Sequence, residues 1–143
     1  MATALKQWHI VQSVELPASA DAVWRIVGGF FNIHQWHPDI AQTEVPENQT
    51  SMSPMRRLLT FPGQPKTTEE LVSLDNLNRC YDYKWHEGKW GEEVQDYRAR
   101  IQVFNTFMDQ RCILQWSSTF TCDHDAVSEF YQHGFDALKK RFA

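Results

Sequence analysis

The chain has 143 residues, of which 42% are hydrophobic and 22% are charged, an ordinary composition for a folded protein with one core. Its 14 basic and 18 acidic side chains give a formal net charge of −4, which disfavours nucleic-acid binding driven by counterion release. Three cysteines without a CxxC spacing predict neither a disulfide framework nor a zinc ribbon, and no apolar run is long enough to span a bilayer. We therefore expect a single domain over residues 1–143, without a signal peptide and located in the cytoplasm.

The first predicted elements are a strand, a helix and a second short helical turn. Residues 8–16 alternate in polarity and are rich in β-branched side chains, which predicts a strand. Ser19 or Asp21 can cap the helix that follows, and the pair Gly28-Gly29 is expected to interrupt it. Residues 32–36 are expected to form a further turn of helix.

Six more strands and a terminal helix are predicted after this opening. Period-two alternation dominates the middle of the chain, and turn signals separate the alternating segments. The strand candidates are residues 40–46, 54–61, 67–75, 79–86, 93–105 and 110–122. Short turns between consecutive strands predict an antiparallel meander. Residues 125–142 have the period of an amphipathic helix, and its internal glycine, Gly134, reflects either a close neighbour on the buried face or a neutral accident.

The order of these elements and a set of short motifs resemble one superfamily. The motifs are Val14-Glu15-Leu16-Pro17-Ala18, Ala22-Val23-Trp24, Trp36-His37-Pro38, Met55-Arg56, Glu69-Glu70-Leu71, Arg79 through Tyr83, Tyr97 with Ala99, Trp116 with Phe120, and Gly134-Phe135-Asp136-Ala137-Leu138. Over nearly its whole length the chain resembles the START-like, Bet v 1-like helix-grip superfamily (SRPBCC), in its polyketide cyclase/dehydratase-like branch. The resemblance implies an α+β fold, in which a seven-stranded curved antiparallel sheet wraps around a long C-terminal helix and two short helices follow the first strand. This superfamily includes lipid carriers, hormone receptors, allergens, cyclases and hydratases, so the fold leaves the function open.

Aromatic side chains are expected to gather on the concave face of this sheet. Alternation places Tyr81, Tyr83 and Trp85 on one face of their strand, and it directs Tyr97 and Trp116 inward from the next two strands. These rings line either a partly open ligand pocket or a solid aromatic core. The sequence does not separate the two.

A charged pair is expected beside these rings. By the resemblance, Arg56 and Glu69 lie on neighbouring strands and point inward, where a buried charge has to be paired. The pair would then form the polar anchor of a ligand. A surface ion pair is the alternative, and Arg57 and Glu70 take the inward positions if the register is shifted by one residue.

The remaining candidate ligand contacts lie at the expected pocket entrance and on the terminal helix. Trp36 and His37 are expected at the mouth of the pocket. Trp90, in a glycine-containing loop, is interpreted either as a lid or as a contact for a protein partner. Three further ligand contacts are Leu71, Tyr131 and Phe135.

No metal site and no cofactor are expected. His34 and His37 have an i, i+3 spacing but no third ligand close in the sequence. The other histidines, which show no metal-ligand spacing, are His9, His86, His124 and His133. Cys80, Cys112 and Cys122 are interpreted as small core residues. The sequence also contains no nucleophile elbow, P-loop or dinucleotide-binding motif.

Three functions stay open at this point. The first is binding, transport or sequestration of a small hydrophobic or aromatic molecule between the sheet and the terminal helix, by a monomer or weak homodimer. The second is a polyketide cyclase or dehydratase that uses the same cavity, with His37, Glu69, Tyr83 or Tyr97 as the acid or base. The third is a protein-interaction module. None of the three involves nucleic acid or stable insertion into a membrane.

Overall fold

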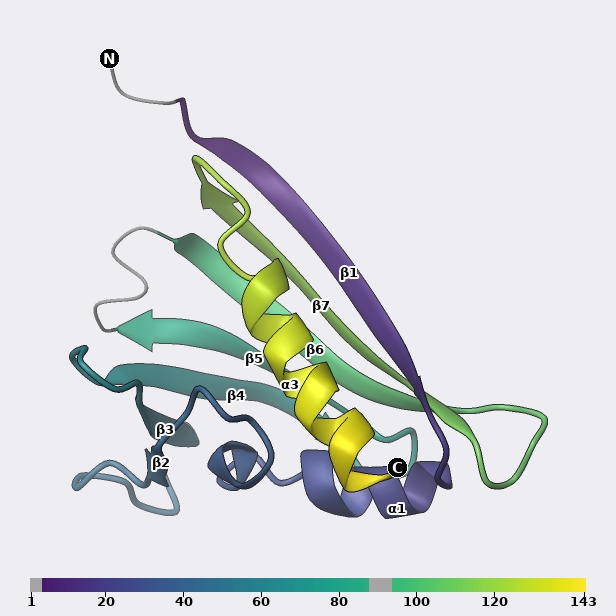
Figure 1. Cartoon of the computed structure of the whole chain (residues 1–143). Helices are drawn as coiled ribbons and strands as arrows, with labels where there is room; N and C mark the ends of the chain where they lie inside the picture. The colour runs from purple at the N-terminus through teal and green to yellow at the C-terminus, as the bar shows by residue number, and fades with distance from the viewer. Residues whose placement is uncertain (1–3, 88–93) are drawn as a thin grey trace.

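The computed structural model describes residues 4–87 and 94–143 of the chain. Within them, seven antiparallel strands form one sheet in the order β1-β7-β6-β5-β4-β3-β2 (Figure 1). The strands are β1 (Lys6–Leu16), β2 (Gln42–Glu44), β3 (Arg56–Thr60), β4 (Thr67–Asp75), β5 (Cys80–Glu87), β6 (Gln95–Asn105) and β7 (Cys112–Cys122). The helices are α1 (Ala20–Val27), the 3₁₀ helix η1 (Ile33–Gln35) and α3 (Ser128–Arg141). The predicted order of elements is confirmed.

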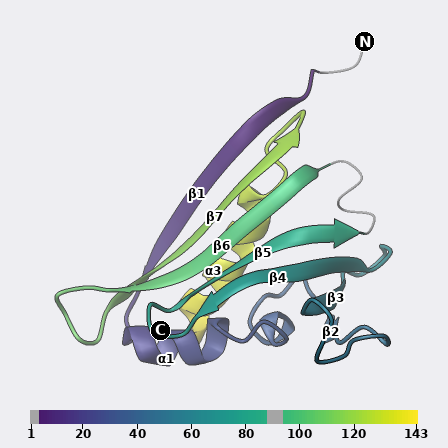
Figure 2. The same ribbon diagram turned by 180° about the vertical axis from the view of Figure 1, so that it is seen from behind.

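Helix α3 lies across one face of the curved sheet (Figure 1). Its buried side of Tyr131, Gly134, Phe135 and Leu138 faces the strands, so the core sits between α3 and the sheet. Figure 2 shows the opposite face, which no described helix covers. The predicted grip of the sheet on the terminal helix is therefore confirmed. No helix among the described residues is long and apolar enough to cross a membrane.

The first and last strands are neighbours in the sheet. β1 pairs with β7 along its whole length, from Lys6 opposite Cys122 to Leu16 opposite Cys112. The other pairings join strands that follow one another in the sequence, and all are antiparallel. The predicted meander is confirmed, and the β1–β7 pairing brings the two ends of the sequence together.

Ser19 caps the first helix as predicted, and an aspartate side chain precedes the terminal helix. The Ser19 hydroxyl accepts a hydrogen bond from the Ala22 N–H at 3.1 Å, and α1 ends immediately before Gly28. The terminal helix begins three residues later than the start of the predicted range 125–142. The Asp125 carboxylate accepts hydrogen bonds from the backbone N–H groups of Val127 and Ser128. The first N–H groups of a helix have no partner inside it, and a side chain that precedes the helix can supply one.

Strands β2 and β3 are shorter than the predicted ranges 40–46 and 54–61. Proline explains where they stop. Pro46 follows β2 and Pro54 precedes β3, and proline has no N–H to contribute to a strand ladder. The sheet is therefore narrow at this edge.

The mid-helix glycine is explained by a close neighbour. A Cβ atom at Gly134 would lie 2.9 Å from Cδ2 of His37 and 3.0 Å from Cζ3 of Trp36. Both rings are buried, so neither is free to move aside. Glycine at this position allows α3 to approach the segment of η1.

Replacing Gly134 with alanine is expected to destabilise the protein. Alanine favours a helix by about 1 kcal/mol over glycine, but overpacking a filled core costs about 1–3 kcal/mol. Urea unfolding should therefore give a net loss of up to about 2 kcal/mol. The exposed change Gln132→Ala in the same helix should stay within about 0.5 kcal/mol of the wild type. A Gly134→Ala protein more stable than the wild type would contradict this account.

Candidate functional site

The predicted aromatic residues lie together on the face of the sheet beneath α3. Tyr81, Tyr83, Tyr97 and Trp116 are each at most 2% exposed. Trp85 is half-buried and lies opposite Glu69 in the β4–β5 register. The inward direction predicted from alternation is confirmed for all of them.

The phenol groups of this face form a chain of hydrogen bonds. Trp116 Nε1 donates to the Tyr83 hydroxyl at 3.0 Å, and the hydroxyls of Tyr83 and Tyr97 lie 3.2 Å apart. The Tyr97 hydroxyl is also hydrogen-bonded to that of Tyr131 on α3. Burial raises the pKa of Tyr83 and Tyr97 well above the usual value for a phenol. These groups therefore stay neutral and can donate or accept hydrogen bonds, but they do not supply a phenolate base.

A buried ion pair joins β3 to β4. Arg57 is fully buried, and its Nε and one terminal nitrogen donate to Oε1 of Glu69 at 3.0 and 2.7 Å. The other terminal nitrogen donates to the Phe30 carbonyl at 2.7 Å and to the Tyr81 hydroxyl at 3.3 Å. The guanidinium also lies 4.2 Å from the ring centre of Phe30. The pair is therefore part of a network, as a buried charge requires.

The prediction that Arg56 pairs with Glu69 is wrong. In the register of β3 and β4, Arg57 lies opposite Glu69 and Arg56 lies opposite Glu70. Arg56 and Glu70 form a separate, partly exposed pair at 3.0 Å on the other face. Because Leu59 is buried and side chains alternate along a strand, β3 has to direct Arg57 inward as well.

Burial and pairing act against each other on these charges. Burial raises the pKa of Glu69, and the charge and hydrogen bonds of Arg57 offset this rise only in part. For Arg57, burial lowers the pKa, but Tyr81, Glu69 and Tyr83 outweigh it, so the pKa is raised. Arg57 stays protonated, and Glu69 is an unusually basic carboxylate.

A small, partly open cavity borders this network. Its volume is about 20 Å³, enough for about one water molecule. It lies between the sheet, η1 and α3, and its lining residues are Ile33, Leu59, Phe61, Thr67, Glu69, Tyr83, Tyr97 and Phe130. Most of the space between sheet and helix is filled by rings, for example by Trp116 stacked on Tyr131 at 4.1 Å. The interior thus combines the two predicted alternatives: it is a largely filled aromatic core with a small hollow beside the ion pair.

Two residues of the lining carry an oxygen atom that lacks a partner among the described residues. Thr67 is 1% exposed, and its Oγ1 makes no hydrogen bond there. Both donors of Arg57 that reach Glu69 go to Oε1, which leaves Oε2 without a described donor. An unpaired buried hydroxyl such as that of Thr67 costs about 1–3 kcal/mol, so this group is suited to a molecule that supplies the missing hydrogen bond, and Glu69 Oε2 can accept a second one.

The prediction that Trp36 and His37 lie at a pocket mouth is wrong. They are 4% and 1% exposed, because the segment after η1 packs under α3 at Gly134. His37 Nε2 donates to the Phe130 carbonyl at 2.7 Å, and Nδ1 accepts from the Asp39 N–H at 3.2 Å. Burial lowers the pKa of His37 to about 4. Both ring nitrogens are hydrogen-bonded to the backbone, so the role of His37 is structural.

The other predicted contacts are distributed around the core. Leu71 is half-buried in β4, Tyr131 belongs to the phenol chain, and Phe135 is buried on α3 outside the cavity lining. Trp90 lies outside the described residues. Among the lining residues that were not predicted, Thr67 was recognisable because it shares a strand face with Glu69. Phe61 is the last residue of the predicted strand 54–61, but it lies after the end of β3, where alternation no longer gives a direction.

Larger depressions occur on the outer face of the sheet. One of about 200 Å³ is bordered by charged side chains that include Asp82 and Arg100. These two side chains are already bonded to each other at 2.6 and 2.9 Å and are open to solvent. The unpaired hydroxyl of Thr67 and the buried carboxylate of Glu69 line the cavity under α3 instead, so that cavity is the candidate site.

The comparison with known families agrees with this architecture. Residues 7–143 match the family described as polyketide cyclase/dehydrase and lipid transport. The chain belongs to this polyketide cyclase/dehydrase and lipid-transport family. The predicted helix-grip relationship is thereby confirmed. None of the curated proteins matches the sequence.

Solved structures of similar fold include proteins from several bacteria. The protein XoxI from Bacillus cereus is 28% identical, with a TM-score of 0.82 and 94% of each chain covered. A protein from Bacillus thuringiensis is 26% identical, with a TM-score of 0.80 and coverage of 94% of this chain and 98% of its own. The Zhui aromatase/cyclase from a Streptomyces species is 16% identical, with a TM-score of 0.76 and coverage of 95% and 93%. At that identity, the likeness to the cyclase concerns the fold alone.

Proposed function

We propose that this family member binds a small hydrophobic or aromatic molecule between the sheet and α3. One observation carries the proposal: the unpartnered hydroxyl of Thr67 and the carboxylate of Glu69, whose Oε2 receives no described donor, belong to the lining of a cavity otherwise made mainly of rings and aliphatic side chains. Ligand sites in proteins combine such apolar walls with a few polar groups that fix orientation. The family description, which includes lipid transport, supports the same function.

The polar groups define the chemistry of the ligand. Glu69 offers a carboxylate oxygen that only accepts hydrogen bonds, whereas the hydroxyl of Thr67 can donate or accept. The matching molecule has an apolar or aromatic body and at least one hydroxyl or similar donor that bonds to Glu69. Arg57 keeps Glu69 in place by holding its other oxygen.

Two rings are in a position to open the cavity. Phe61 lies in the β3–β4 turn and Phe130 lies on α3, and their ring centres are 5.8 Å apart. Both are only half-buried, in contrast to the rings beneath them. A molecule larger than water enters when these side chains turn outward, which enlarges the space without breaking the ion pair.

Mass spectrometry of material that co-purifies under native conditions tests the proposal directly. A thermal-shift panel of lipids, flavonoids and polyketide-like aromatics supplies probes if nothing co-purifies, since a ligand that binds only the folded state raises the melting temperature. We expect compounds with an apolar body and a hydroxyl to stabilise the protein. An absence of co-purified material together with no shift across the panel would count against ligand binding.

The change Thr67→Val is expected to separate ligand recognition from stability. Valine keeps the shape and removes an unpaired buried hydroxyl, so the ligand-free protein should gain about 1 kcal/mol. For the panel compound that stabilises the wild type most, binding should weaken about fivefold, the equivalent of one lost hydrogen bond. Calorimetry measures both quantities.

The matched control is Thr60→Val, because Thr60 Oγ1 is also buried and unpartnered but lies outside the cavity lining. It should raise stability in a similar way and leave binding unchanged. If both variants bind the compound as tightly as the wild type does, Thr67 has no part in recognition.

A second candidate function is acid–base catalysis in the same cavity, and it rests on Glu69. Burial raises the pKa of this carboxyl, and one of its oxygens lacks a described donor, as a general base requires. His37 is excluded as the base because both of its nitrogens are occupied. Turnover of a polyketide-like substrate that disappears in Glu69→Gln, while Thr67→Val only weakens binding, would favour the enzyme.

A further inference from the structure

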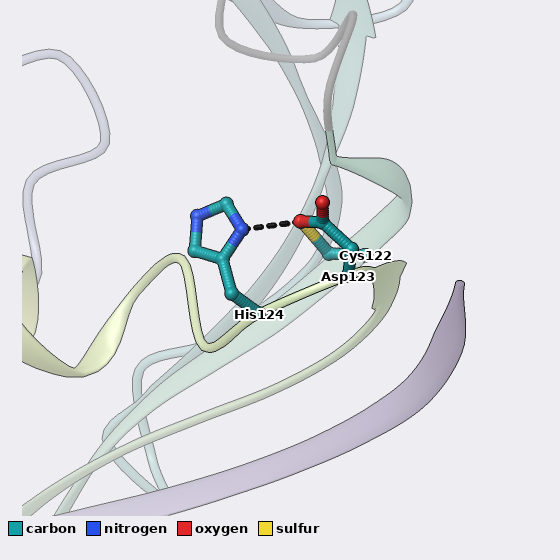
Figure 3. A group of neighbouring side chains, drawn as sticks. All are labelled: Cys122, Asp123 and His124. Carbon is teal, nitrogen blue, oxygen red and sulfur yellow. Dashed lines mark hydrogen bonds and ion pairs between the residues drawn. The ribbon is translucent and has the colours of Figure 1, made fainter. Parts of the chain in front are cut away.

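Three donor side chains of different chemistry meet at the end of β7, away from the residues that line the cavity. Cys122 Sγ lies 3.7 Å from Oδ1 of Asp123 and 3.7 Å from Nδ1 of His124, and those two atoms are 2.5 Å apart. All three donor atoms lie within 4.8 Å of one another. Figure 3 shows the three side chains turned toward the same point.

The backbone holds one side of this cluster in place. Cys122 is the last residue of β7 and pairs with Lys6 of β1, and its carbonyl accepts a hydrogen bond from Trp8 Nε1 at 3.1 Å. Its side chain is buried. Asp123 and His124 belong to the turn that follows, and their side chains are 43% and 58% exposed. The cluster thus has a fixed sulfur and two side chains that are free to adjust.

The triangle of donor atoms fits a tetrahedral metal ion with little movement. Usual zinc–sulfur, zinc–nitrogen and zinc–oxygen bond lengths give edges of about 3.5 Å from sulfur to nitrogen or oxygen, and about 3.4 Å from nitrogen to oxygen. Both sulfur edges already have nearly this length. Only the distance between Asp123 and His124 has to open, by about 0.9 Å, and both of these side chains are exposed.

We propose that Cys122, Asp123 and His124 form a zinc site with one coordination position open to water. A thiolate and an imidazole together select zinc or a similar transition metal over magnesium or calcium, which prefer oxygen ligands. Zinc binds the deprotonated thiol of Cys122, so binding releases the thiol proton and weakens at low pH. Bound metal ties the end of β7 to the turn that leads into α3.

A zinc site here differs from the expectation that the chain has no metal site. His124 has neither a histidine at a helical i, i+3 spacing nor a CxxC motif beside it, so its position in the sequence does not indicate a metal ligand. Three consecutive ligands come together here because a turn follows directly on a strand. Alternation along an extended strand would have sent the neighbours to opposite faces.

Titration of the reduced, metal-free protein with Co²⁺ tests the site, because a cobalt–thiolate bond gives a charge-transfer absorption that carboxylate and imidazole ligands alone do not give. We expect this absorption at one equivalent, its loss on addition of Zn²⁺, and one zinc ion per chain by calorimetry. His124→Ala should weaken zinc binding at least about 100-fold, since removing an outer partner of a ligand already costs about 10- to 100-fold. His124 is exposed, so this variant should fold normally.

The matched control is His133→Ala. His133 is also partly exposed and hydrogen-bonded to an aspartate, with its Nδ1 2.7 Å from Oδ2 of Asp39. It does not belong to the group of Cys122, Asp123 and His124. This variant should bind zinc as the wild type does. Absence of the cobalt–thiolate absorption, or unchanged zinc binding in a folded His124→Ala protein, would overturn the proposal. Circular dichroism of each variant establishes that it is folded.

Discussion

Replacing Arg57 with methionine is expected to destabilise the fold by about 3–5 kcal/mol, because it removes one partner of a buried ion pair. The change leaves the Glu69 carboxylate buried without its partner, and it removes the donor to the Phe30 carbonyl. Without Arg57 the pKa of Glu69 rises further, so the loss should be smaller at acidic pH. Urea unfolding followed by tryptophan fluorescence measures it.

The neighbouring pair provides the control. Arg56→Met removes the same chemical group from the adjacent residue of β3, but Arg56 and Glu70 are partly exposed. The expected loss there is at most about 1 kcal/mol. The double change Arg57→Met with Glu69→Leu should recover most of the stability, because it removes the isolated charge. Equal losses from Arg56→Met and Arg57→Met would contradict the assignment of the buried pair.

Acidification is expected to destabilise the protein through His37. The pKa of His37 is about 4 in the folded state, because burial lowers it from 6.5 more strongly than the Phe130 carbonyl and Asp39 raise it. Between pH 6.5 and 4 the unfolded chain therefore binds a proton that the folded chain does not. The contribution of His37 is fully present above pH 6.5 and is lost progressively toward pH 4, on the order of 3 kcal/mol in total.

Unfolding free energies of wild type and His37→Phe across this range measure the effect. Phenylalanine keeps the stacked ring but leaves the Phe130 carbonyl unpaired, so the variant should be less stable at pH 7 and lose less stability on acidification.

The pH dependence of the stability that His133 contributes has the opposite sign. The pKa of His133 is raised by the hydrogen bond with Asp39, so its pairing stabilises the fold at low pH and is lost as pH rises. His133→Ala should therefore keep the acid sensitivity, and an unchanged slope in His37→Phe would contradict the role of His37.

The strands and helices could be predicted from the sequence because their periods are regular. Alternation placed Tyr97 and Trp116 inward, and Ser19 marked the start of α1. The ends of β2 and β3 were harder to predict from the sequence, since they depend on which N–H groups a proline removes from the strand ladder. The identity of the fold followed from the order of elements rather than from any single motif.

The candidate site was predicted only in part. The sequence around β3 reads Arg-Arg-Leu-Leu, in which both registers place one arginine and one leucine inward, so alternation alone does not choose between Arg56 and Arg57. The choice is made by pairing with β4 and by the burial of Leu59. The size of the cavity was not predictable either, because it depends on the rotamers of rings such as Phe61 and Phe130, and no pattern in the sequence encodes them.

The pairing of the first strand with the last one also imposes an order of assembly during synthesis. Trp8 and Cys122, which are joined by a hydrogen bond, are 114 residues apart in the chain. At about 5–20 residues per second, a ribosome needs on the order of ten seconds to complete β7 after it has made β1. Through that interval β1 is a strand without its neighbour, whereas β2 to β6 can pair as each emerges. The final closure of the sheet is therefore a late, long-range step of the kind that slows folding.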